Sequence, residues 1–81
     1  MKAIELSNAI ARRYFLHASD TNDDGTRCCY FGQELLNEDG WGFWVEPNGT
    51  VVRDETSANG KLPSPRIVDA CVRAAVKFLG R

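Results

Sequence analysis

The 81-residue chain lacks any run of about 18 apolar residues, which is the length that a membrane-spanning helix needs. Its first residues, Met-Lys-Ala-Ile-Glu, mix charged and apolar side chains at once, so we expect no secretory signal peptide. A cytoplasmic protein is therefore expected, with no membrane partner. A chain of this length forms one domain, residues 1–81, with a small core and no deep enclosed cavity.

Cysteine and histidine are also scarce, with three cysteines and one histidine. Cys28 and Cys29 are adjacent and Cys71 lies far away, an arrangement unsuited to a disulfide framework. No Cys-x-x-Cys pair is present, so the usual structural zinc sites are excluded. We expect reduced thiols, no metal and no cofactor. The pattern leaves open whether Cys28 or Cys29 faces solvent and links two copies by a disulfide.

Basic residues are rare in the middle of the chain. Nine of the 11 acids but only two of the 10 bases lie between Asp20 and Glu55, so this segment has a net charge of −7. Residues 1–19 carry +2 and residues 56–81 carry +4, which brings the whole chain to −1. Such a separation of charge bears on partners and on association rates rather than on the fold.

Apolar periodicity predicts two helices and three strands. Helical spacing covers residues 2–17, and a second helix is expected from Pro65, with Ser64 as its N-cap and Gly80 at its end. Alternation predicts strands at residues 27–35, 41–46 and 50 to about 55. The order α-β-β-β-α predicts an α+β fold, a three-stranded antiparallel sheet with two helices packed on one face.

The opposite face of this sheet is expected to be open to solvent. If Trp41, Phe43 and Val45 point toward the helices, Trp44 points the other way, close to Tyr30. Two aromatic side chains on an open sheet face form a candidate contact surface. The same face, an edge strand, and Leu16 or Val76 on otherwise polar helical faces would also suit a homodimer.

Residues 20–25 carry the sharpest local pattern, with Asp20, Asn22 and Asp24 at alternating positions, followed directly by Gly25. This stretch resembles the first half of an EF-hand calcium loop, which needs hard oxygen ligands and a glycine for its turn. Phe31 stands where that family places a bidentate glutamate. The alternative is a polar loop whose side chains form local turns.

No catalytic signature accompanies the candidate reactive residues. His17 would need to meet a cysteine in three dimensions, and no glycine-rich nucleophile turn is present. The neighbouring carboxylates at 38–39 and 54–55 are expected in turns and at a sheet edge rather than in a substrate cleft. We therefore expect that the protein is not an enzyme.

The α-β-β-β-α order resembles a double-stranded-RNA-binding domain, and this resemblance covers most of the chain. That family carries a lysine cluster at the start of its second helix, whereas residues 65–69 here, Pro-Arg-Ile-Val-Asp, hold one arginine and one acid. The resemblance implies a nucleic-acid-binding module. Its basic helical face would consist of Arg12, Arg13, Arg66, Arg73 and Lys77.

The size of the domain, the absence of a catalytic motif and the acidic middle segment are similar to small proteins of phages and mobile elements, notably anti-CRISPR proteins. This resemblance implies a non-catalytic inhibitor in the host-cell cytoplasm. It would bind a protein partner with a basic surface, such as a CRISPR effector complex, and occupy its nucleic-acid-binding surface. The contact candidates are Tyr30, Trp44, Asp23, Asp24, Glu38, Asp39, Asp54 and Glu55.

Overall fold

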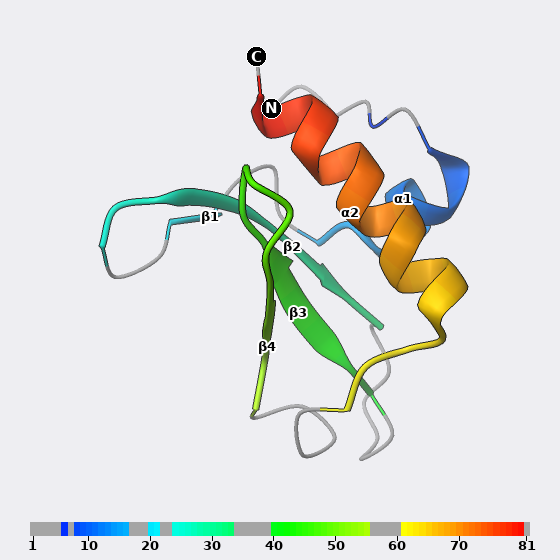
Figure 1. Cartoon of the computed structure of the whole chain (residues 1–81). Coiled ribbons are helices and arrows are strands. Elements are labelled where there is room, and N and C mark those ends of the chain that lie inside the picture. The colour runs from blue at the N-terminus through cyan, green and yellow to red at the C-terminus, as the bar shows by residue number, and fades with distance from the viewer. Residues whose placement is uncertain are drawn as a thin grey trace.

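The structure is a computed structural model that describes residues 6, 8–16, 20–21, 24–33, 40–55 and 61–80. Its elements are listed in chain order as α1 (Ala9–Tyr14), β1 (Asp20–Thr21), β2 (Arg27–Gly32), β3 (Gly42–Val45), β4 (Val51–Arg53) and α2 (Pro65–Leu79). The strands follow one another in the order β1-β2-β3-β4, and all neighbours are antiparallel (Figure 1). The predicted α+β fold is confirmed, and the short β1 adds a strand at one edge of the sheet.

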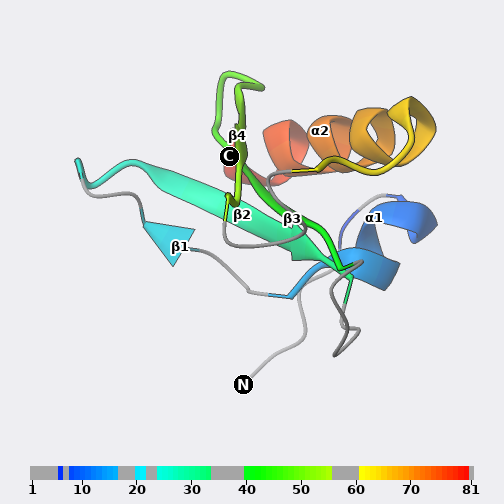
Figure 2. The same cartoon turned by 90° about the horizontal axis from the view of Figure 1, so that it is seen from below.

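The two helices pack beside each other on one side of the sheet. Helix α2 contacts β2 and β3, while α1 contacts α2 and β2. Figure 2 views the molecule from below and shows α2 above the strands, with α1 at the end of β2. The face of the sheet turned away from α2 is called the outer face below.

The core lies between α2 and the inner face of β2 and β3. Phe31 and Phe43 are register partners across these two strands, are fully buried, and stack with ring centroids 5.7 Å apart. Small residues on α2, among them Ala74 and Ala75, bring the helix close to the two rings. Truncation of a buried phenylalanine to alanine typically costs about 3–5 kcal/mol, so this pair is a main source of stability.

Helix α1 is shorter than predicted, because the chain is capped at Asn8 rather than near residue 2. The Asn8 side chain accepts hydrogen bonds from the backbone N–H groups of Ile10 (2.8 Å) and Ala11 (3.3 Å). Leu6 lies before the helix, and its carbonyl accepts a 2.8 Å bond from Nη1 of Arg12. The rest of the predicted first turn, and His17, lie outside the described residues.

The first helix also ends earlier than predicted, at Tyr14, because the backbone of the next two residues pairs with the sheet. Phe15 forms a bridge with Phe31, and the Leu16 N–H donates a 3.1 Å bond to the Tyr30 carbonyl. Pairing with β2 satisfies these backbone groups at the sheet edge, which a further helical turn would leave uncovered. Residues 15 and 16 are therefore extended.

The strands lie at their predicted positions with narrower bounds. Strand β2 ends at Gly32, and β3 and β4 each begin one residue later and end one or two residues earlier than predicted. Within β1, Asp20 and Thr21 pair with Cys28 and Arg27, so the prediction of a loop is wrong at these two residues. The turn between β3 and β4 contains Pro47-Asn48-Gly49, residue types that are typical of tight turns. Gly49 has a φ of +91°, and Asn48 accepts a 2.9 Å bond from the Thr50 N–H.

Helix α2 has the predicted bounds, and Asp69 pairs with Arg73, four residues further on, at 3.1 Å on exposed side chains. Its two ends differ from expectation in detail. The Ser64 side chain makes no capping hydrogen bond, although its carbonyl accepts bonds from the N–H groups of Ile67 and Val68. Gly80 ends the helix with a φ of −78°, so no left-handed residue is needed there.

Candidate partner-binding face

One row of side chains crosses the outer face from edge to edge, namely Leu16, Tyr30, Trp44 and Val52, which we call the outer-face row. Tyr30, Trp44 and Val52 are register neighbours on β2, β3 and β4. The Tyr30 and Trp44 rings contact each other with centroids 4.9 Å apart, as the sequence predicted. Leu16 and Val52 are 40% and 38% exposed, and they are the two large hydrophobic residues most open to solvent in the described part of the chain.

Two glycines make room for this row. Gly32 and Gly42 are register partners, and both are buried. A Cβ on Gly42 would lie 2.9 Å from Cζ of Tyr30 and would overlap its hydroxyl, and a Cβ on Gly32 would lie 2.8 Å from Cδ1 of Leu16. The tyrosine ring therefore lies flat across the sheet above Gly42, a close approach that only glycine permits.

The Tyr30 ring reaches over β3 to the far strand. Its hydroxyl donates a 2.7 Å hydrogen bond to Oδ2 of Asp54, the residue that follows β4. The Asp54 backbone N–H donates in turn to the Gly42 carbonyl at 3.0 Å. A short bond to a carboxylate is among the stronger hydrogen bonds in proteins, so the acid and the aromatic ring are held in one arrangement.

Three of the predicted contact residues, Tyr30, Trp44 and Asp54, are brought together here, and exposed Glu55 follows Asp54 directly. Asp24 lies elsewhere, in the turn that precedes β2, and Figure 1 shows the start of β2 well away from the end of β4. Its carboxylate accepts a 2.9 Å bond from the Thr26 N–H, and hydrogen bonding to Thr26 lowers the pKa of Asp24. The other predicted contacts, Asp23, Glu38 and Asp39, lie outside the described residues.

Two members of the row, Leu16 and Val52, were not predicted from the sequence. Leu16 was assigned to a helix, so its place on the sheet was not foreseen. Val52 lies within the predicted third strand, and alternation from inward-facing Val51 would have placed it on the outer face beside Trp44.

All three cysteines are buried, and none of them forms a disulfide. Cys28 is register partner of Asp20 and is fully buried, so neither Cys28 nor Cys29 is available to link two copies by a disulfide without a change of structure. Burial raises the pKa of Cys29 to about 11 and that of Cys71 to about 12, so both thiols stay protonated near neutral pH. Protonated, inaccessible thiols do not serve as nucleophiles.

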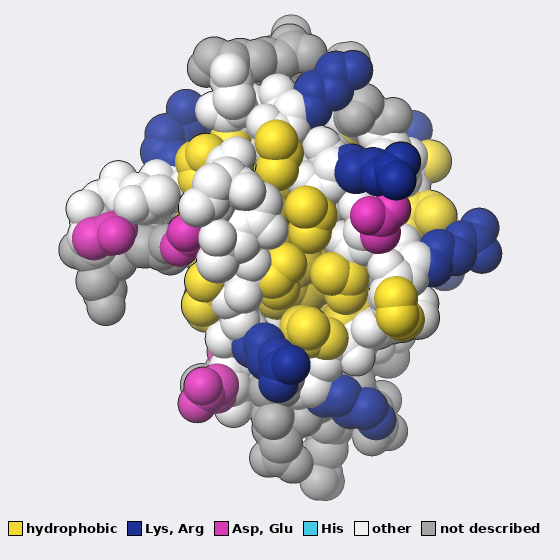
Figure 3. Space-filling view, in the orientation of Figure 1, with side chains coloured by type: hydrophobic (Ala, Val, Ile, Leu, Met, Phe, Trp, Pro, Cys, Tyr) yellow, Lys and Arg dark blue, Asp and Glu magenta, His cyan; other side chains and the backbone are white. Residues whose placement is uncertain are grey.

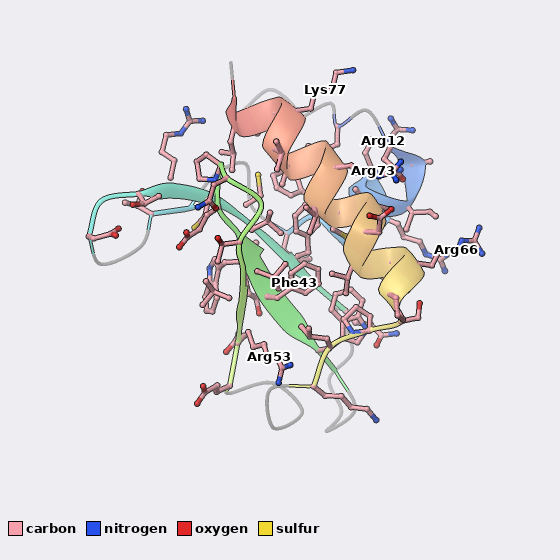
Figure 4. All side chains as sticks on the ribbon, in the orientation of Figure 1. Arg12, Phe43, Arg53, Arg66, Arg73 and Lys77 are labelled. Atoms are coloured by element: carbon pink, nitrogen blue, oxygen red, sulfur yellow. The ribbon has the colours of Figure 1, made fainter. Side chains whose placement is uncertain are left out.

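The charges are separated between the two layers. In the described parts of the helical layer, residues 6–16 and 61–80, six bases accompany one acid, Asp69. Figure 3 views this side of the molecule and shows apolar side chains in its centre, with Lys, Arg, Asp and Glu side chains around them. In Figure 4, Arg12, Arg66, Arg73 and Lys77 extend outward from the helices. The described residues between 20 and 55 hold five acids and two bases.

Metal binding finds no support in the part of the chain that the structure describes. No group of three or more His, Cys, Asp or Glu side chains lies close enough there to hold an ion. Asp20 belongs to β1, and the Asp24 carboxylate accepts a bond from the Thr26 backbone N–H. The residues between them, 22 and 23, lie outside the described residues.

Comparison of the chain with protein-family models, with curated proteins and with solved structures finds no match. Among the described residues, no helix has the length and apolar character to cross a membrane. Functional inference therefore rests on the geometry of the outer face and on the distribution of charge.

Proposed function

We propose that this chain is a non-catalytic binding protein whose outer face docks on a protein partner with a basic surface. The observation that carries this proposal is the outer-face row, in which two aromatic rings lie between two exposed aliphatic side chains. Soluble proteins rarely place such a continuous apolar row on a sheet face unless something covers it.

The outer-face row has the aromatic and aliphatic composition that is typical of the centre of a protein interface. Aromatic residues supply much of the energy at protein interfaces, and Tyr30 and Trp44 are already held in place by their mutual contact. Asp54, which is bonded to Tyr30, and exposed Glu55, which follows it in the chain, favour a basic partner because complementary charge speeds association and selects the orientation. Since Asp54 is engaged by Tyr30, Glu55 is the acid more available to a partner.

The partner class that suits this surface is a protein that itself handles nucleic acid, because such proteins carry extended basic surfaces. In this proposal the chain acts as an inhibitor of the anti-CRISPR kind. It would bind a CRISPR effector complex in the host-cell cytoplasm and compete for the surface that receives nucleic acid. The net charge of −7 between Asp20 and Glu55 supports this choice of partner.

Affinity capture from a cell lysate, run with and without nuclease, tests the proposal. We expect a protein partner that remains bound after nuclease treatment. Capture of RNA or DNA alone, lost after nuclease treatment, would contradict it.

A second candidate function, nucleic-acid binding, is favoured by one specific observation, the excess of five positive charges in the described helical layer. In this alternative Arg12, Arg66 and Lys77 contact phosphates, and the outer face has no role. Binding of labelled duplex RNA would then weaken steeply as salt rises. It would also weaken in a Lys77→Glu variant and stay unchanged in a Val52→Lys variant.

A further inference from the structure

A small pocket lies between α1 and the start of α2, on the helical side of the molecule and away from the outer face. Its volume is about 280 Å³, and its lining residues are Ile10, Arg13, Tyr14, Ser64, Arg66 and Ile67. The pocket therefore joins two elements that are more than 40 positions apart in the chain.

The floor of the pocket is apolar and firmly supported. Ile10, Tyr14 and Ile67 are half-buried, and Tyr14 and Ile67 pack against the core. The Tyr14 ring contacts Trp41 with centroids 5.0 Å apart, which fixes the orientation of that wall.

The rim carries two positive charges from different elements. Arg13 comes from α1, with its guanidinium carbon 5.8 Å from the centre of the Tyr14 ring, and Arg66 comes from the first turn of α2. Both are exposed, and in the described part of the chain the carboxylate nearest in sequence to Arg66, that of Asp69, is paired with Arg73 instead. Figure 4 shows Arg66 extending from the start of α2, on the side away from the sheet.

Ser64 adds a hydroxyl to the same lining. Its position before Pro65 is that of a capping residue, yet its side chain makes no capping bond. The hydroxyl and the two guanidinium groups can donate hydrogen bonds to an anionic oxygen, while the apolar lining can contact a hydrophobic part of the same ligand.

We propose that this pocket binds an anionic group, a phosphate or a carboxylate, attached to an apolar or aromatic moiety. The guanidinium groups of Arg13 and Arg66 hold the anion, and the moiety packs on Ile10, Tyr14 and Ile67. The site is independent of the outer face and of the function proposed for it.

Titration followed by two-dimensional NMR tests this site on the whole chain, with phenyl phosphate and benzoate as anionic probes. Phenol serves as the uncharged probe, and inorganic phosphate tests the anion without the apolar body. We expect saturable shifts at Ile10, Arg66 and Ile67 with one or both anionic probes. The stronger of the two identifies the source as a phosphate or a carboxylate. Phenol and inorganic phosphate are expected to bind more weakly than that probe.

Four variants provide the decisive comparison. Arg13→Gln and Arg66→Gln should each weaken probe binding by about tenfold or more, because each removes a charged hydrogen-bond donor. Lys77→Gln is the matched control on α2 and should leave the affinity unchanged, as should the outer-face variant Val52→Lys. Since all four side chains are exposed, each variant should keep the dispersed spectrum of the folded protein. Shifts that do not saturate, equal binding of phenol, or equal weakening by Lys77→Gln would overturn the proposal.

Discussion

The phenol of Tyr30 on β2 donates a 2.7 Å hydrogen bond to the carboxylate of Asp54, two strands away across the outer face. This bond links the middle of the sheet to its β4 edge, and it passes over Gly42 on β3. It positions the aromatic ring that we place at the centre of the proposed interface.

A Tyr30→Phe variant keeps the ring and removes the donor. Because Asp54 is half-buried, we expect a loss of about 0.5–1.5 kcal/mol in the free energy of unfolding, measured by urea denaturation. Asp54→Asn is the matched control, since it keeps an acceptor oxygen for the phenol and should cost less. A Tyr30→Phe variant as stable as the wild type would show that the bond contributes no net stability.

Gly42→Ala should disturb the same ring from below. The added methyl group would overlap the Tyr30 hydroxyl, so we expect a cost of about 1–3 kcal/mol, which is typical of overpacking. In a Tyr30→Ala background the overlap is absent, and the same substitution should cost much less. A double-mutant cycle of urea unfolding measures this coupling. Equal costs in both backgrounds would mean that the ring does not lie over Gly42.

The two helix N-termini give a contrasting pair of predictions. Asn8→Ala removes two capping hydrogen bonds from a helix of six residues, and we expect it to cost about 1 kcal/mol. Ser64→Ala should change stability little, because the Ser64 side chain makes no capping bond. Thermal or urea unfolding of both variants checks this difference. A larger loss at Ser64 than at Asn8 would contradict the structure.

These two caps also show where sequence reasoning succeeds and where it fails. The bounds of α2 follow from Pro65 and from an apolar stripe, and both signals are local. The limits of α1 are set by Asn8 on one side and by pairing of Phe15 with Phe31 on the other. Pairing with a distant strand is a tertiary effect, and helical periodicity that runs through residues 2–17 gives no sign of it.

The candidate site shows the same division. Alternation along β3 placed Trp44 on the opposite face of the sheet from Phe43. The contact of Trp44 with Tyr30 followed from the predicted strand order. The hydrogen bond between Tyr30 and Asp54 was not predicted. It depends on the register of three strands and on the absence of a side chain at Gly42, which leaves room for the tyrosine ring. Reversal of the charge at Asp54 would break this internal bond, so Glu55→Lys is the cleaner test of the acidic edge.

The buried thiols predict a dependence of stability on pH. Burial raises the pKa of Cys29 to about 11 and of Cys71 to about 12, while the ordinary value of 9.0 applies to the unfolded chain. The folded state thus holds these protons more tightly. Their contribution to stability is present below pH 9 and is lost as the pH rises from 9 through 11 to 12.

Urea unfolding at several alkaline pH values measures this loss, which is about 1.4 kcal/mol per pH unit for each thiol within its window. A Cys71→Ala variant should show a smaller slope than the wild type. At pH 8 the thiols of the folded protein should react with an alkylating reagent only after unfolding. Rapid labelling of the native protein would contradict the burial of all three cysteines.

The central claim, that the outer face is a protein-binding surface, is tested most directly at Val52. Val52 is exposed at the end of the outer-face row, so its replacement should leave the fold intact. The measurement is the affinity for the captured partner of wild type, Val52→Lys and the matched control Val52→Thr, which keeps the branched shape. We predict that Val52→Lys abolishes binding, that Val52→Thr weakens it only moderately, and that Lys77→Glu on the helical layer leaves it unchanged. Unchanged affinity in Val52→Lys, with loss of binding in Lys77→Glu, would contradict the account and assign the partner to the basic helical layer.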